Sequence, residues 1–283
     1  MKQLALSIAL ALLTAAPPLH AQARDIPSAA PKQVAGETAD QRGRKLLDQM
    51  LEALGGDAWL HRRNVRELGH LGRFFRGTPT GIVIDFTATR QFGSNERPDA
   101  QRIGFITDKS IIFPGKKIDI VQIWANGTGH EVTYKGNATL PKDQIEDYYR
   151  RQDHSIESIY RTWLKAPGVM VVAEGSTTVE RRLTERVSIL SANNDAITVD
   201  IDTDTHLPRR RTFETRNPQF KDIDEDVEEY DDYHTIQGLP TAFTLTRYHN
   251  GDMASQTFFS KIEYDVDLTP DTFDPNILLK KKQ

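Results

Sequence analysis

Three aspartates at alternate positions and a nearby histidine are the residues whose types and spacing most suggest chemistry. The stretch VDIDTDTHLPRRR places them at Asp200, Asp202, Asp204 and His206. Alternate residues of a strand point to one face, so carboxylates spaced in this way can share a metal ion. The glycine and distal glutamate of an EF-type calcium loop are absent, and Asp and Thr before Leu-Pro are typical of a tight turn. We therefore favour a hairpin turn over a metal site.

Motifs for catalysis are otherwise absent from the sequence. There is no H-E-x-x-H zinc motif, no G-x-S-x-G nucleophile elbow and no phosphate-binding loop. The chain has no cysteine, which excludes disulfides, thiol nucleophiles and thiolate metal sites. The sequence therefore predicts a protein that is not an enzyme and that uses no cofactor.

A basic run, Arg209–Arg211, and an acidic run, Asp222–Asp232, flank the turn signal Asn217-Pro218. As separate surfaces, the two runs would suggest a polyanion site and a cation site. On neighbouring strands they would face each other, and opposite charges paired across strands contribute roughly 0.2–1 kcal/mol each. Because the turn signal lies between the runs, cross-strand pairing is the favoured interpretation.

An aromatic face follows Pro141, where the sequence predicts one helix over residues 142–165. The face consists of Ile145, Tyr148, Tyr149, Ile156, Ile159, Tyr160, Trp163 and Leu164. Charged residues occupy the other side of the helix. Two interpretations stay open. The face completes the core under a sheet, or it forms the lid of an apolar concavity in a strongly curved sheet.

The elements around these residues are mostly strands. A first helix is predicted over Thr38–Leu54, from an apolar stripe that ends at Gly55-Gly56. From Asn64 onward, short runs rich in β-branched and aromatic residues alternate with turn residues, including runs at 109–113 and 178–191. No helix between them suits a parallel crossover, so roughly eleven or twelve strands form an antiparallel meander.

The N-terminus has the pattern of a secretory signal peptide over residues 1–23. Lys2 precedes an apolar run, two prolines and an Ala-Gln-Ala sequence that ends at Ala23. Export without cysteine indicates the Gram-negative periplasm. Loss of Lys2 changes the formal net charge from -4 to -5, which argues against a nucleic-acid partner. No later segment approaches the roughly 20 apolar residues of a membrane-spanning helix. We expect a disordered lead-in over 24–39 and a single domain over 40–283.

The order of motifs resembles the outer-membrane lipoprotein-sorting-like superfamily, which comprises the Lol-type carriers and their relatives. A helix ending in Gly-Gly precedes a strand in LEALGGDAWLHRRNVRELGHLG. Later come a D-x-x-T-x-L-P turn over Asp202–Pro208, then Tyr230, Tyr233, Gly238 and Pro240, and a closing element at Phe273–Pro275. The resemblance implies a mainly β fold, an incomplete antiparallel barrel whose open side is covered by helices and which holds acyl chains of lipoproteins.

These observations predict a periplasmic, non-enzymatic binding or carrier protein for an apolar or lipidic ligand, such as the acyl chains of a lipoprotein. The candidate lining residues are Phe86, Phe105, Ile123, Tyr148, Tyr149, Ile159, Tyr160 and Trp163. One alternative is an envelope module that senses or scaffolds a protein partner. A second is a metal-dependent hydrolase, which requires Asp200, Asp202 and His206 to converge.

Overall fold

A computed structural model describes residues 37–94, 98–106, 118–216 and 222–279. The helices are α1 (Ala39–Leu54), α2 (Gly56–Leu60), α3 (Lys142–Asp153), α4 (Ile156–Arg161) and the short 3-10 helix η1 (Trp163–Lys165). The strands are β1 (Asn64–Phe75), β2 (Thr78–Gln91), β3 (Ala100–Ile106), β4 (Ile120–Ala125), β5 (Thr128–Val132), β6 (Asn137–Thr139), β7 (Met170–Val179), β8 (Arg182–Leu190), β9 (Ala196–Asp202), β10 (Pro208–Arg216), β11 (Ile223–Ile236), β12 (Leu239–His249) and β13 (Asp252–Tyr264).

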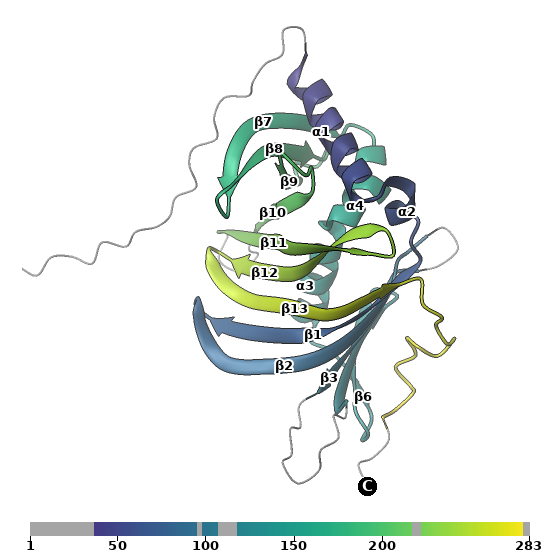
Figure 1. Ribbon diagram of the computed structural model, residues 1–283. Coiled ribbons are helices and arrows are strands. Elements are labelled where there is room, and N and C mark those ends of the chain that lie inside the picture. The colour runs from purple at the N-terminus through teal and green to yellow at the C-terminus, as the bar shows by residue number, and fades with distance from the viewer. Residues whose placement is uncertain (1–36, 95–97, 107–117, 217–221, 280–283) are drawn as a thin grey trace, which may run out of the picture.

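The thirteen strands found in the described residues form a single antiparallel sheet in the order β6-β5-β4-β3-β2-β1-β13-β12-β11-β10-β9-β8-β7. The first and last strands, β1 and β13, pair near its middle, while β6 and β7 lie at its two edges. The helices between β6 and β7 in the sequence must therefore cross from one edge to the other, and they do so on one face of the curved sheet (Figure 1). We call this face the inner face.

Helix α1 forms where the apolar stripe predicts it. Thr38 caps its first turn in a capping box with Gln41, and Gly55 ends it in the left-handed conformation, at φ 116°. Its buried side, including Leu47 and Met50, packs against Val187 and other strand residues in the largest apolar cluster. Helix α4 adds to the same cluster, so the β7–β9 end of the inner face is filled.

The sequence prediction differs from the structure in three elements. The helix expected over 142–165 breaks into α3, α4 and η1, because Ser155 accepts a hydrogen bond from the Ser158 amide and starts a new helix. The strand expected over 178–191 is interrupted by a turn, since Glu180 and Arg181 both take positive φ values; β8 follows this turn, and β7 before it was mostly not predicted. The three-residue β6 was not predicted. These additions raise the strand number above the predicted eleven or twelve.

The predicted fold class is confirmed: the protein is mainly antiparallel sheet that does not close into a barrel, with a few helices. The predicted signal peptide over 1–23 lies outside the described residues, as do the strand expected at 109–113 and all but the last three residues of the lead-in. In the described part of the chain, no helix is both long and apolar enough to cross a membrane.

Candidate functional site

The aspartates of the VDID stretch are structural. The Asp200 carboxylate lies on the outer face of the sheet, where Arg186 donates two hydrogen bonds to it at 2.7 and 3.0 Å. The Asp202 carboxylate accepts hydrogen bonds from the backbone amides of Asp204 and Thr205 and so closes the turn. The predicted turn is confirmed. Across the described ranges, no group of three or more His, Asp or Glu residues is arranged to hold a metal ion.

The basic run pairs with the acidic run across β10 and β11, as predicted. Arg209 lies 2.9 Å from Asp231, Arg210 2.8 Å from Glu229 and Arg211 2.6 Å from Glu228. Burial alone would raise the pKa of Glu228, but attraction by Arg247 and Arg211 outweighs it and lowers the pKa to about 2. The two runs therefore stabilise neighbouring strands, which is the favoured interpretation of their charges.

The register of the central strands fixes which side chains face the helices. Trp124 of β4 stacks on Tyr148 of α3, with ring centroids 4.1 Å apart, so Trp124 points to the inner face. Side chains alternate along each strand, and the other inward positions follow from the pairing. These inward residues form three rows that run across the strands, which we call the inner rows. The first row crosses β12, β13, β1 and β2 and consists of Leu245–Thr257–Leu71–Ile84. The second and third rows cross β13, β1, β2, β3 and β4 and consist of Phe259–Gly69–Phe86–Phe105–Ile120 and of Ile262–Glu67–Ala88–Ile103–Gln122.

The inner rows are mostly apolar and incompletely covered. Leu71, Ile84, Ile103 and Phe105 all remain half-buried, so solvent reaches parts of their side chains. At the β7–β9 end of the same face, Ile159 and its strand partners are fully buried. The covering helices therefore fill one end of the inner face and leave apolar surface at the other.

Gly69 shapes the second row. A Cβ atom at this position would lie 2.4 Å from the Phe258 carbonyl oxygen, because the backbones of β1 and β13 approach closely at a bulge. The missing side chain also lets two rings meet across β1. Phe86 and Phe259 contact edge to face, with centroids 6.1 Å apart.

The structure does not bring the eight predicted lining residues together. Phe86 and Phe105 pair directly in the second inner row. Tyr148 and Tyr149 lie on α3, beside Trp124. Ile123 points to the outer face, where it packs with Val121 and with Phe273 and Leu279 of the C-terminal segment.

The other three predicted residues belong to the filled end of the molecule. Ile159 is 0% exposed and Tyr160 donates a hydrogen bond to the Leu47 carbonyl, so both are integrated in the core with α1. Trp163 packs at the edge of the same cluster and donates to the Asp153 carbonyl. For these three residues of the aromatic face, the structure matches the interpretation that the face completes the core under the sheet.

Glu67 is the one carboxylate in the inner rows. Its neighbours across the strands are Ala88 and Ile262, and no hydrogen bond or ion pair joins it to any described residue. Burial raises the pKa of Glu67 to about 7, although Arg90 opposes the shift. A carboxyl group without an ion-pair partner among the described residues therefore lies between apolar neighbours.

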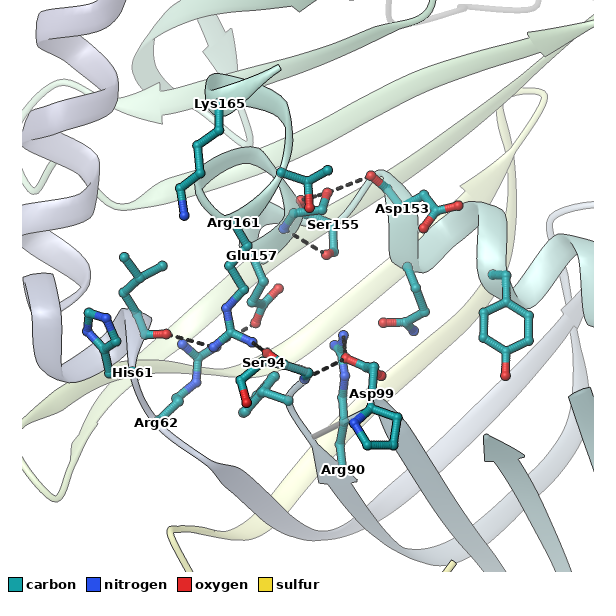
Figure 2. A pocket seen from close by; sticks show the side chains of 18 residues that line it. His61, Arg62, Arg90, Ser94, Asp99, Asp153, Ser155, Glu157, Arg161 and Lys165 are labelled. Atoms are coloured by element: carbon teal, nitrogen blue, oxygen red, sulfur yellow. Dashed lines mark hydrogen bonds and ion pairs between the residues drawn. The ribbon is translucent and has the colours of Figure 1, made fainter. Parts of the chain in front are cut away.

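A charged pocket adjoins the inner rows where α3 and α4 meet the end of β2 and the residues just before β3 (Figure 2). Its volume is about 660 Å³, within the range typical of small-ligand sites. Its charged walls are formed by Arg62, Arg90, Asp99, Asp153, Glu157, Arg161 and Lys165. Arg90 belongs to the fourth row, Tyr264–Val65–Arg90–Gln101–Trp124, so the pocket lies directly beside the third.

Two ion pairs hold the floor of this pocket. The Arg62 guanidinium lies 4.1 Å from the Trp59 ring centre and 4.4 Å from that of Phe92, and it pairs with the Glu157 carboxylate. Burial would raise the pKa of Glu157, but the attraction of Arg62 and Arg90 outweighs it and lowers that pKa. Arg90 in turn lies 3.2 Å from Asp99.

The sequence prediction missed every charged residue of this pocket. Arg62 follows α2, Arg90 lies near the end of β2, and Glu157 lies on α4, so the residues are far apart in the chain. One signal was present: Arg90 continues the inward positions of Ile84, Phe86 and Ala88 in β2, where an apolar residue would be expected.

No family model and no curated protein sequence matches the chain. Among solved structures, a DUF1329 family protein from Desulfovibrio piger superposes with a TM-score of 0.55 at 12% identity, covering 84% of this chain and 98% of that one. A LolA superfamily protein from Nitrosomonas europaea matches at a TM-score of 0.48 and 7% identity, covering 82% and 96% of the two chains. MucB matches at 0.32 and 9%, covering 85% and 65%.

The chain thus shares the fold of the DUF1329 family protein. An open antiparallel sheet with helices across its inner face is also the architecture that the Lol-type resemblance implies. The fold class that the resemblance implies is therefore confirmed, and the fold alone does not define a ligand.

Proposed function

We propose that the chain is a periplasmic, non-enzymatic binding or carrier protein whose apolar or lipidic ligand lies along the three inner rows. The acyl chain of a lipid or lipoprotein has the required chemistry. The observation that carries this proposal is the set of half-buried apolar side chains on the inner face, around Ile84, Ile103 and Phe105.

The energetics of burial support an apolar ligand. Each methylene that moves from water to the inner rows contributes about 0.8 kcal/mol, so one acyl chain gains useful affinity without polar contacts. Uncovered apolar surface is also unfavourable in the unliganded protein, which a ligand would relieve.

A pair of adjacent residues gives a matched test. Ile84 points to the inner face, whereas Val83 points outward and is 56% exposed. We expect Ile84→Asp to weaken binding of a fluorescent fatty acid at least about tenfold, because the buried charge has no partner there. Val83→Asp should bind like the wild type.

Circular dichroism and thermal unfolding of both variants would verify folding before the titration. Equal affinities for the two folded variants would contradict a ligand site on the inner rows. Ile103→Trp provides a second test, because it fills the same space without adding charge and should also reduce uptake.

A further inference from the structure

Two exposed charges of the charged pocket lie outside its ion pairs. Arg62 pairs with Glu157, and Arg90 pairs with Asp99. The Lys165 ammonium and the Asp153 carboxylate make no hydrogen bond or ion pair with any part of the chain that the structure describes. Lys165 and Asp153 are both exposed, and they lie on opposite sides of the pocket (Figure 2).

Each of these charges has a neighbour of the same sign. Arg161 lies on the Lys165 side, where its guanidinium donates to the carbonyls of Leu60 and Gly93. Asp99 lies on the Asp153 side. Partial burial, together with the carboxylates of Asp195 and Asp99, raises the pKa of Asp153 against the effect of His154, so a cation beside this carboxylate would be favourable.

A third polar group completes the acidic side. Gln152, next to Asp153, lines the pocket, and its side-chain oxygen is buried and has no hydrogen-bond partner among the described residues. A buried acceptor without a partner is costly, and a donor on a ligand would satisfy it. The acidic side therefore offers acceptors for an ammonium group.

The arrangement selects against ligands of a single charge. A simple anion would be attracted by Lys165 and repelled by Asp153. A simple cation would be attracted by Asp153 and repelled by Lys165. A zwitterion matches both sides. A phosphate suits the lysine and arginine side, because ionised donors form strong hydrogen bonds to phosphate oxygens.

We propose that this pocket binds a phosphoethanolamine group, with the phosphate toward Lys165 and Arg161 and the ammonium toward Asp153 and Asp99. The pocket adjoins the third inner row through Arg90, so the group would be the headgroup of a lipid whose chains lie on the inner rows. Only the assignment of the group to a lipid headgroup rests on the proposed function. Free phosphoethanolamine is the other source of the same chemistry.

Calorimetric titration of the full chain with O-phosphoethanolamine, inorganic phosphate and ethanolamine tests the pocket itself. We expect the zwitterion to bind at least about fivefold more tightly than either fragment, and Lys165→Gln and Asp153→Asn each to remove about fivefold of its affinity. Lys45→Gln and Asp143→Asn, at exposed positions outside the pocket, are matched controls. Equal binding of zwitterion and phosphate, or variants that bind like the wild type, would overturn the proposal.

Incubation with vesicles that contain phosphatidylethanolamine and phosphatidylglycerol, followed by mass spectrometry of bound lipid, separates the two sources. Enrichment of phosphatidylethanolamine in the wild type, lost in Lys165→Gln, supports the headgroup. Binding of free O-phosphoethanolamine without lipid enrichment overturns the lipid source. If fatty-acid uptake is insensitive to Ile84→Asp while the pocket still selects the zwitterion, the proposed function fails and the pocket assignment stands.

Discussion

At the scale of residues, the inner face combines apolar rows with carboxyl groups whose pKa values are shifted in different directions by their surroundings. Glu157 and Glu228 are buried against arginines, which keep both groups ionised. Glu67 has no such partner, and burial raises its pKa from 4.5 to about 7. Paired charges therefore hold the helices and strands in place, whereas Glu67 adds a carboxyl group that titrates near neutral pH.

The raised pKa of Glu67 predicts a pH-dependent stability. Between about pH 4.5 and pH 7 the unfolded chain loses the Glu67 proton while the folded chain retains it, so this group destabilises the fold increasingly as the pH rises. We expect Glu67→Gln to raise the melting temperature at about pH 8 and to have little effect at about pH 4.5. Thermal unfolding of both proteins across this range is the measurement. A difference that grows toward low pH would contradict the assignment.

The buried pair of Arg62 and Glu157 predicts a large loss on neutralisation. Glu157→Gln leaves the Arg62 guanidinium buried without its counter-charge, which should lower the free energy of unfolding by about 3 kcal/mol. Glu146→Gln is the matched control, because its pair with Lys142 is exposed on α3 and should contribute less than about 0.5 kcal/mol. Denaturant unfolding that gives equal losses for the two variants would show that the Arg62 pair is not buried in solution.

At the scale of elements, the position of the helices follows from strand order. Because β6 and β7 lie at opposite edges of the sheet, α3 and α4 cross the inner face, while α1 covers its β7–β9 end. Close packing fixes α1: a Cβ atom on Gly43 would lie 2.8 Å from a Val171 methyl group and 3.1 Å from the Ala173 nitrogen. The helix–sheet distance at this point therefore requires glycine.

This contact predicts that replacing Gly43 by alanine lowers the stability of the protein, which is the opposite of the usual effect in a helix interior. Ala normally stabilises a helix interior relative to Gly by about 0.5–1 kcal/mol, but Gly43→Ala should destabilise the protein by about 1 kcal/mol through overpacking. In a Val171→Ala background the penalty should shrink, because the nearest methyl group is gone. Denaturant unfolding of the single and double variants measures this coupling. A Gly43→Ala protein more stable than the wild type would contradict the packing.

Elements were predictable where local signals agreed. Thr38, Gly55 and the leucine stripe define α1 in both sequence and structure. The β7–β8 hairpin was missed because Glu180 and Arg181 are not the residues that usually adopt positive φ. The break before α4 was missed because the apolar period continues through it.

At the scale of the whole molecule, the site depends on information that is distributed along the chain. Phe86 and Phe105, both candidate lining residues, pair in the second inner row, whereas the direction of Ile123 depends on strand register, which the sequence did not determine. Ile159 and Tyr160 are buried because α1 returns to cover them. The charged pocket joins α2, β2, α3, α4 and η1, and no local pattern connects these segments.

The central claim is that an apolar ligand lies on the inner rows of the half-open sheet. Photo-crosslinking with a diazirine-bearing fatty acid, followed by peptide mass spectrometry, tests it most directly. The claim predicts adducts on Leu71, Ile84, Ile103 and Phe105, all of which an excess of unlabelled fatty acid suppresses. Adducts confined to the outer face, at Val83 or Phe258, would contradict it.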